Sequence, residues 1–219
     1  LRKVAESQPL LHYVVNDQFA SGPGPIEDID PFTVMATFNR GVTWDNRRAI
    51  IRALADELGV KAPVPDDFDA VPVLNNQKSW FVTYAVNRQD SDIPNLWAVF
   101  AAGLALASDE SEANRRVFCA AYDAALQVKG VKWNLTQGLY WSRPNDFVSL
   151  DGPSRRYLQQ RFSLDDPVDG ESYLKLRDGL QQRLANARNS VTSFPLLSYA
   201  AWLSAERKYP GHDVKGFAT

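Results

Sequence analysis

Apolar residues recur along the chain mostly at helical spacing, which predicts a mainly helical protein. In the run NRRAIIRALADEL, four apolar side chains share one helical face: Ile50, Ile51, Leu54 and Leu58. Thr43 or Asp45 is available to cap the first turn, and Gly59 follows as a stop signal. We therefore expect an amphipathic helix over about residues 46–58.

The same spacing predicts further helices downstream. Asp92 with Pro94 opens a helix whose buried stripe we expect at Leu96, Trp97, Phe100 and Leu104. Asp109 and Glu112 fit a capping box ahead of a second helix, which Gly130 ends. The pattern predicts three more helices, at about residues 153–162, 171–187 and 194–208.

Strand signals are few and short. The run SWFVTYAV (79–86) is rich in aromatic and β-branched residues and predicts a strand, and residues 147–150 predict another. Residues 1–15 fit a helix or a strand, residues 135–140 fit a helical turn, and residues 20–31 are rich in Gly and Pro and predict a loop. The fold class expected is mainly α with minor β (α+β): a helical domain with short strands and long loops containing Pro, Gly and Asn.

We expect three parts along the chain. Residues 1–30 form an N-terminal segment and loop, residues 31–209 form a single mainly helical domain, and residues 210–219 form a polar tail or linker. The chain begins with Leu rather than Met, so we expect it to be part of a longer polypeptide.

The charge balance and the cysteine content narrow the class of protein. The formal net charge is −2, so no global basic field draws the chain to nucleic acid, and DNA contact would need a local patch. The single cysteine, Cys119, excludes an internal disulfide and fits a reducing compartment. A signal peptide and a long apolar run are both missing, so we expect a cytoplasmic protein without a membrane partner.

Motifs for catalysis are missing from the sequence. The only histidines, His12 and His212, lie near opposite ends, which leaves no zinc spacing and disfavours a Ser-His-acid triad. The sequence has neither a phosphate-binding P-loop nor Gly-x-Gly-x-x-Gly. A nuclease metal site is disfavoured because Asn76 stands where a carboxylate would precede Lys78. We expect no catalytic residue, no metal and no cofactor in this chain, although a carboxylate-only magnesium site leaves little signature.

Three polar-aromatic clusters are candidate DNA-binding surfaces. Amide side chains can read an adenine edge, Arg can bind guanine or phosphate, and Trp can stack on an exposed base. The candidates are Arg40, Arg47, Arg48, Asn75, Asn76, Lys78, Trp80, Trp133, Asn134, Trp141 and Arg143. The competing interpretation is structural: Asn residues cap turns, and Trp rings are half-buried with a bonded indole N–H.

The order of several blocks resembles a known family. They are DIDPFTVMATFNRGVTWDNRRAIIRALADELGV, VPVLNNQKSWFV, DIPNLWAVF, GVKWNLTQGLYWSRPNDFVSLDGPSRRYL and SFPLLSYAAWL. Together they are similar to the region upstream of the motor domain in McrB-like AAA-family ATPases of modification-dependent (type IV-like) restriction systems. The resemblance covers roughly residues 28–203. Relatives often have Gly where Ala70 stands and Met where Gln137 stands.

The resemblance implies a division of labour. The upstream region reads DNA or positions a reader, an AAA motor in the same polypeptide hydrolyses GTP or ATP with Mg, and a separate McrC-like nuclease subunit cuts. The leading hypothesis is therefore a non-catalytic module that binds plain or modified DNA in anti-phage defence. The alternatives are a protein-interaction or spacer module, and an unrecognised enzyme whose carboxylates Asp66, Asp67 and Asp69 meet in a deep pocket.

Overall fold

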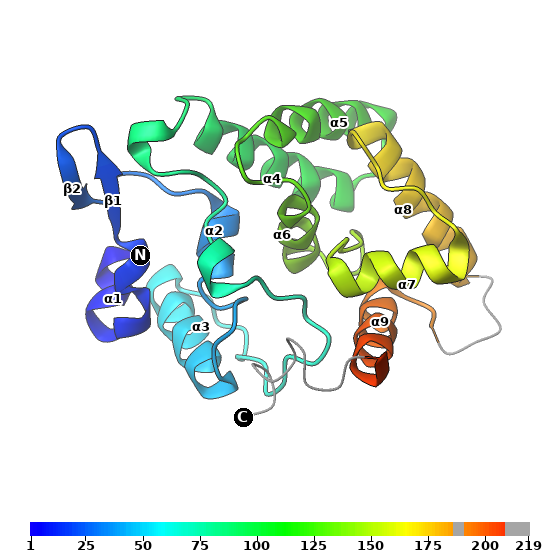
Figure 1. Ribbon diagram of the computed structural model, residues 1–219, viewed down its shortest axis with the longest axis horizontal. Coiled ribbons are helices and arrows are strands. Elements are labelled where there is room, and N and C mark those ends of the chain that lie inside the picture. Colours follow the sequence, from blue (N-terminus) through cyan, green and yellow to red (C-terminus); the bar gives the residue numbers. More distant parts are fainter. Residues whose placement is uncertain (186–190, 209–219) are drawn as a thin grey trace.

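The computed structural model describes residues 1–185 and 191–208, apart from the side chains of Lys78 and of residues 206–208. Helices make up most of it, and its only sheet within the described residues has two strands, so the predicted fold class is confirmed. In Figure 1 the N-terminal elements lie to the left, and the helices from α4 onward form the right-hand part. The predicted tail, residues 210–219, lies outside the described residues.

The first 25 residues form two short helical turns and a β-hairpin. Helix α1 (Arg2–Ser7) is followed by the 3₁₀ helix η1 (Pro9–Val14), and strands β1 (Asn16–Phe19) and β2 (Gly22–Pro25) pair antiparallel. The expectation of a loop throughout residues 20–31 was wrong, because the GPGP run forms β2. Proline is compatible with a two-stranded hairpin because an edge strand leaves part of its backbone N–H groups unpaired.

The next two helices begin at side-chain caps. Helix α2 (Pro31–Ala36) is capped by Asp30, whose Oδ1 accepts from the Thr33 backbone N–H at 2.8 Å. Helix α3 (Trp44–Leu58) begins at Thr43, whose hydroxyl accepts from the Asn46 backbone N–H, and ends at Gly59 in the left-handed conformation (φ 68°). The predicted stop at Gly59 is confirmed, and of the two cap candidates the structure uses Thr43.

Helices α4 (Asp92–Ser108) and α5 (Glu112–Leu126) pack side by side at the top of Figure 1. The stripe expected for α4 was partly wrong: Leu96 is buried, but Trp97 is 46% exposed. The stripe instead runs through Ile93, Leu96, Val99, Ala102 and Leu106. The cap of α5 is Ser111 rather than Asp109.

The remaining helices agree with the sequence pattern. They are α6 (Asn134–Ser142), α7 (Gly152–Phe162), α8 (Gly170–Ala185) and α9 (Phe194–Lys208). The last two residues predicted for the helix at 171–187 lie outside the described residues. Close approach is allowed by glycine at two helix contacts. A Cβ on Gly138 of α6 would collide with the ring of Phe32, and one on Gly170 would lie 2.7 Å from the Cα of Cys119.

The two strands predicted at 79–86 and 147–150 do not form. Helix η2 (Asn76–Lys78, 3₁₀) precedes the first stretch, and helix η3 (Ala85–Asn87, 3₁₀) includes its last two residues. The second stretch follows a turn and forms neither helix nor strand. Side chains replace the missing strand neighbours. The Phe81 N–H donates to the Thr33 hydroxyl, and the Leu150 N–H donates to the Thr136 hydroxyl, both at 2.9 Å.

The apolar residues form two packed groups. The larger one contains Phe32 and Phe81 and runs through α4 to α9, and the smaller one joins α1 and η1 to Ile50 and Leu54 of α3. Trp80 packs against both groups and so connects them. Within the described residues, no helix is long and apolar enough to cross a membrane.

Candidate recognition surfaces

Arg40 is bound inside the fold. Its side chain is buried, its Nη2 donates to the Leu10 carbonyl at 2.9 Å, and its Nε donates to the Thr37 carbonyl at 3.3 Å. The guanidinium also lies 4.1 Å from the centre of the Tyr13 ring. These contacts connect η1 to α2, and they leave the charge of Arg40 without a surface to present to a phosphate.

Arg47 is buried more deeply, with 1% of its surface exposed. Its Nη2 donates to Asn39 Oδ1, and its guanidinium lies 4.1 Å from the centre of the Phe68 ring. Burial lowers the pKa of this guanidinium to about 10, because the charged form has lost its water. Arg47 therefore supports the packing of α3 against the segment around Phe68.

Arg48 lies at the surface and is held by acidic and carbonyl groups. Its Nη2 pairs with Asp45 Oδ1 at 2.6 Å, and its Nη1 donates to the Asp66 carbonyl at 2.7 Å. Among the three arginines of the first cluster, it is the one with solvent access.

The two asparagine amides of the second cluster bond to backbone groups, one nearby and one distant in sequence. Asn75 Oδ1 accepts from the Gln77 N–H at 2.8 Å and so caps η2, and Asn76 Nδ2 donates to the Gly41 carbonyl at 3.0 Å. Trp80 is half-buried and its ring packs 6.2 Å from that of Tyr84. The side chain of Lys78 lies outside the described part of the chain.

The third cluster is also tied into the fold. Trp141 Nε1 donates to the Pro72 carbonyl at 2.8 Å, and Trp133 lies under the guanidinium of Arg155, which is 4.2 Å from the ring centre. Arg143 is half-buried and has a long bond of 3.4 Å to the Ser108 hydroxyl. Asn134 is half-buried in the first turn of α6.

The structure brings the three clusters together through the segment 72–76. The Leu74 N–H donates to the Asn39 carbonyl at 3.0 Å, and Leu74 forms a parallel bridge with Arg40. The bonds from Asn76 to Gly41 and from Trp141 to Pro72 attach the other two clusters to the same segment. The polar side chains that the sequence singled out therefore serve mainly to hold loops together.

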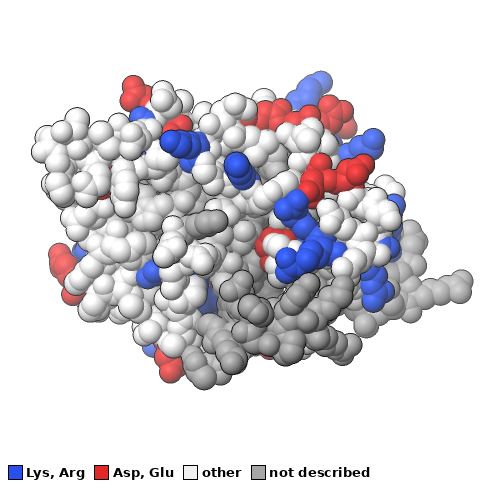
Figure 2. Space-filling model, viewed as in Figure 1, with Lys and Arg blue, Asp and Glu red and all other residues white. Residues whose placement is uncertain are grey.

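Charge on the molecular surface is mixed. On the face drawn in Figure 2, basic and acidic side chains lie beside one another over the right-hand part, and the left-hand part is largely uncharged. The proposed carboxylate group does not form a pocket, because Asp66, Asp67 and Asp69 are all exposed. Across the described ranges no three His, Cys, Asp or Glu residues meet to hold a metal ion.

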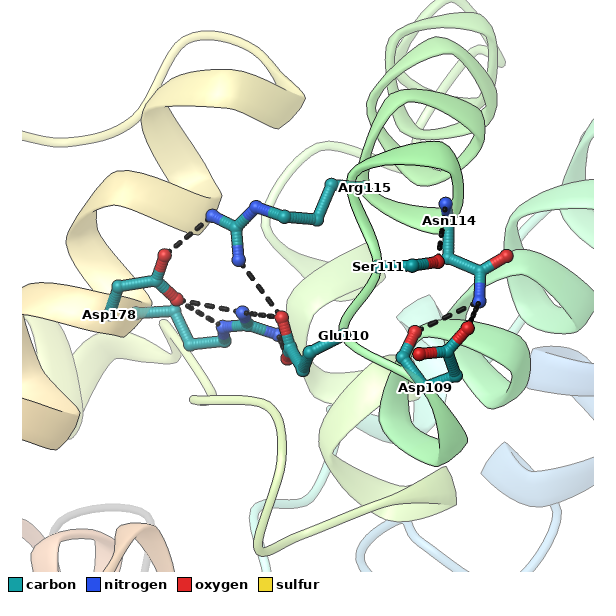
Figure 3. Close-up of polar contacts among 7 residues, drawn as sticks. Asp109, Glu110, Ser111, Asn114, Arg115 and Asp178 are labelled. Carbon is teal, nitrogen blue, oxygen red and sulfur yellow. Dashed lines mark hydrogen bonds and ion pairs between the residues drawn. The ribbon is translucent and has the colours of Figure 1, made fainter.

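An ion-pair network was missed by sequence reasoning (Figure 3). Arg177 of α8 is 1% exposed, and its Nη1 lies 2.8 Å from Glu110 Oε1 and its Nη2 2.7 Å from Asp178 Oδ1. Arg115 of α5 binds the same two carboxylates at 2.9 and 2.5 Å. Arg115 is half-buried in this network, whereas its neighbour Arg116 is exposed. No local signal links Glu110 to Asp178, which are far apart in the sequence.

A groove lies between α7 and α9, which pack against each other in the lower right of Figure 1. It has a volume of about 540 Å³, and its walls combine apolar residues of α9 with an aromatic, an amide and a cationic side chain of α7. The sequence pattern assigned no role to it. Its lining includes Tyr157, Gln160, Arg161, Val191, Ala200 and Leu203.

The fold and these surfaces define a mainly helical α+β domain whose conspicuous polar residues are largely internal. Residues 5–204 match the model of one protein family, described as Domain of unknown function (DUF8425). Because the match spans most of the chain, the protein belongs to this family. No curated protein matches the chain, and no solved structure does.

Proposed function

We propose that this domain is a non-catalytic protein-interaction module upstream of the motor in a McrB-like restriction ATPase, where it links a DNA reader to the motor or aids motor assembly in anti-phage defence. The motor would use GTP or ATP with Mg and act with a McrC-like nuclease subunit in the cytoplasm. One observation carries the choice of an interaction module: Arg40 and Arg47, two of the proposed phosphate contacts, are buried and bonded within the fold.

Two positions at which the chain departs from McrB-like sequences support the proposed relation to McrB-like ATPases. Ala70 has φ 59°, a left-handed conformation that favours glycine, and glycine is the residue that related sequences often have there. Gln137 is buried, and its Oε1 has no hydrogen-bond partner among the described residues. An apolar Met, frequent in related sequences, would leave no such atom unsatisfied. Both departures occur where the backbone and the core favour the related residue.

DNA binding by this domain stays a prediction. The surface arginines that remain for it are Arg48 and Arg143, and both already have partners in the fold. The net charge of −2 also gives duplex DNA little long-range attraction. A protein partner needs no such field, because burial of apolar surface drives association.

Sedimentation velocity tests the proposal directly. The domain is mixed with the part of the polypeptide that contains the motor, and we expect a complex at micromolar concentration. In parallel, methylated and plain duplexes are titrated at low salt by fluorescence anisotropy. Arg48→Gln and Arg143→Gln serve as the DNA-contact variants. The proposal is wrong if the motor does not bind and a duplex does, with an affinity that these two substitutions reduce.

A further inference from the structure

One wall of the α7–α9 groove is an apolar face of α9. Ala200 and Leu203 line the groove, and Leu196 and Tyr199 lie one helical turn before them on the same face. Leu196 is 42% exposed and Tyr199 is 38% exposed. This face therefore continues the apolar lining of the groove along the helix into solvent.

The opposite wall, on α7, is cationic at its rim. Arg161 lines the groove with its guanidinium 5.3 Å from the centre of the Tyr157 ring, which holds the charge beside an apolar surface. Arg156 is exposed, but its guanidinium lies beside Gly152 at the start of α7, so Arg161 is the cation of α7 that lines the groove. The sequence of α7, GPSRRYLQQRF, contains no acidic residue.

We propose that the groove binds an acidic amphipathic helix of a partner protein, with its apolar side on α9 and its carboxylates towards Arg161. This inference rests on the proposed function and names the chemistry of the partner. An amphipathic helix laid in a groove between two helices buries apolar side chains and leaves its charges at the rim. Complementary charges at such a rim give specificity.

The apolar wall is what distinguishes a peptide from a nucleic acid here. A DNA backbone would bind Arg161 but leave Leu196, Leu203 and the exposed part of α9 in contact with a charged, hydrated polymer. An acidic helix satisfies both walls at once. A second copy of this chain would have to bring an acidic face of its own to the groove, and sedimentation of the domain alone would detect it as a dimer.

The test uses two fluorescein-labelled model peptides of equal length. Each carries leucines at helical i, i+3, i+4 spacing, and the remaining positions are Glu and Ala in one peptide and Lys and Ala in the other. We expect anisotropy to show that the domain binds the acidic peptide at least tenfold more tightly than the basic one. Equal binding of the two peptides, or no binding of the acidic one, overturns the inference.

Single substitutions then locate the site. Arg161→Glu is expected to weaken acidic-peptide binding about tenfold, as reversal of a rim charge does when it faces a carboxylate. Leu196→Asp is expected to weaken it as well, through the apolar wall. Arg116→Glu, a charge reversal at an exposed position of α5, is the matched control and should leave binding unchanged within about twofold. Circular dichroism confirms that all three variants fold.

The outcomes separate this inference from the function it builds on. If the motor binds the domain but Arg161→Glu leaves peptide binding unchanged, the groove assignment fails and the interaction role stands. If the acidic peptide binds in the groove and the motor does not, the partner is a protein other than the motor. Duplex DNA that displaces the peptide and depends on Arg161 replaces the peptide with a nucleic acid as the ligand.

Discussion

Arg47 and Arg177 are equally buried, each with 1% of its surface exposed, yet their charges are stabilised in different ways. Arg47, on the α3 side, bonds to a neutral amide and faces an aromatic ring. Arg177, on the α8 side, pairs with Glu110 and Asp178. The first charge is held by dipoles and a π face, and the second by opposite charges.

Asp30, the cap of α2, extends the comparison to a buried carboxylate. It is fully buried and accepts hydrogen bonds from two neutral groups, the Thr33 N–H at 2.8 Å and the Thr33 hydroxyl at 2.5 Å. Burial raises the pKa of Asp30 to about 6, although its bonds to Thr33 favour the charged form. Arg47 and Asp30 are thus buried charges with neutral partners, whereas Arg177 is neutralised by carboxylates.

Removing the paired charge should have the largest effect. Arg177→Met leaves Glu110 and Asp178 without their buried partner, while Arg115 still binds both carboxylates, so we expect the free energy of unfolding to fall by about 3 kcal/mol. Urea denaturation measures it. Arg116→Met, an exposed control in α5, should change it by less than about 0.5 kcal/mol. Equal effects of the two substitutions would mean that the network contributes nothing.

The raised pKa of Asp30 predicts that the stability of the fold depends on pH. The folded-state pKa of Asp30 is about 6, above the unfolded value of 3.8, so the folded state holds more protons between these values. The contribution of Asp30 to stability is therefore present below pH 3.8 and is lost as the pH rises through 6. Relative to Asp30→Asn, the wild type should lose about 2 kcal/mol between pH 4.5 and pH 7.

Urea denaturation of both proteins at each pH gives that difference. Asp28→Asn, a change at an exposed carboxylate nearby, is the control. Its free energy of unfolding should change with pH as that of the wild type does. A constant difference between the wild type and Asp30→Asn across this pH range would contradict the raised pKa.

The smallest effect is expected for the arginine with neutral partners. Arg47→Met replaces a desolvated charge with an apolar side chain of similar length, and only the Asn39 side-chain oxygen Oδ1 loses its donor. We expect the free energy of unfolding to change by no more than about 1 kcal/mol, because the desolvation of the charge offsets most of what its contacts contribute. Chemical denaturation of Arg47→Met and Arg177→Met in parallel measures the two losses of unfolding free energy. A loss as large as that of Arg177→Met would show that the ring and amide stabilise Arg47 as strongly as two carboxylates.

Several helices could be predicted because their signals are local. The cap at Thr43 and the stop at Gly59 lie within one turn of the helix that they bound, and α9 runs over the range that its apolar spacing predicts. The side of α4 that is buried could not be predicted as well. Trp97 has the largest side chain of the expected stripe, but its indole N–H donates to the Ile29 carbonyl at the surface.

The candidate site was predicted as a set of residue types, and their roles depended on contacts distant in sequence. Asn76 bonds to Gly41, Trp141 to Pro72 and Arg40 to Leu10. A pattern of Asn, Trp and Arg is the same whether these groups face a base or a backbone carbonyl. The sequence therefore located the polar loops and not the direction in which their side chains point.

The sequence by itself determined the helical class and the ends of helices such as α3, because spacing and caps act within a few residues. Only the tertiary structure decided whether a stretch with strand composition becomes a strand. Residues 79–86 and 147–150 have that composition, yet the hydroxyls of Thr33 and Thr136 take the place of a neighbouring strand. A strand needs a partner for its backbone, and the partner is chosen by the packing of segments far apart in the chain.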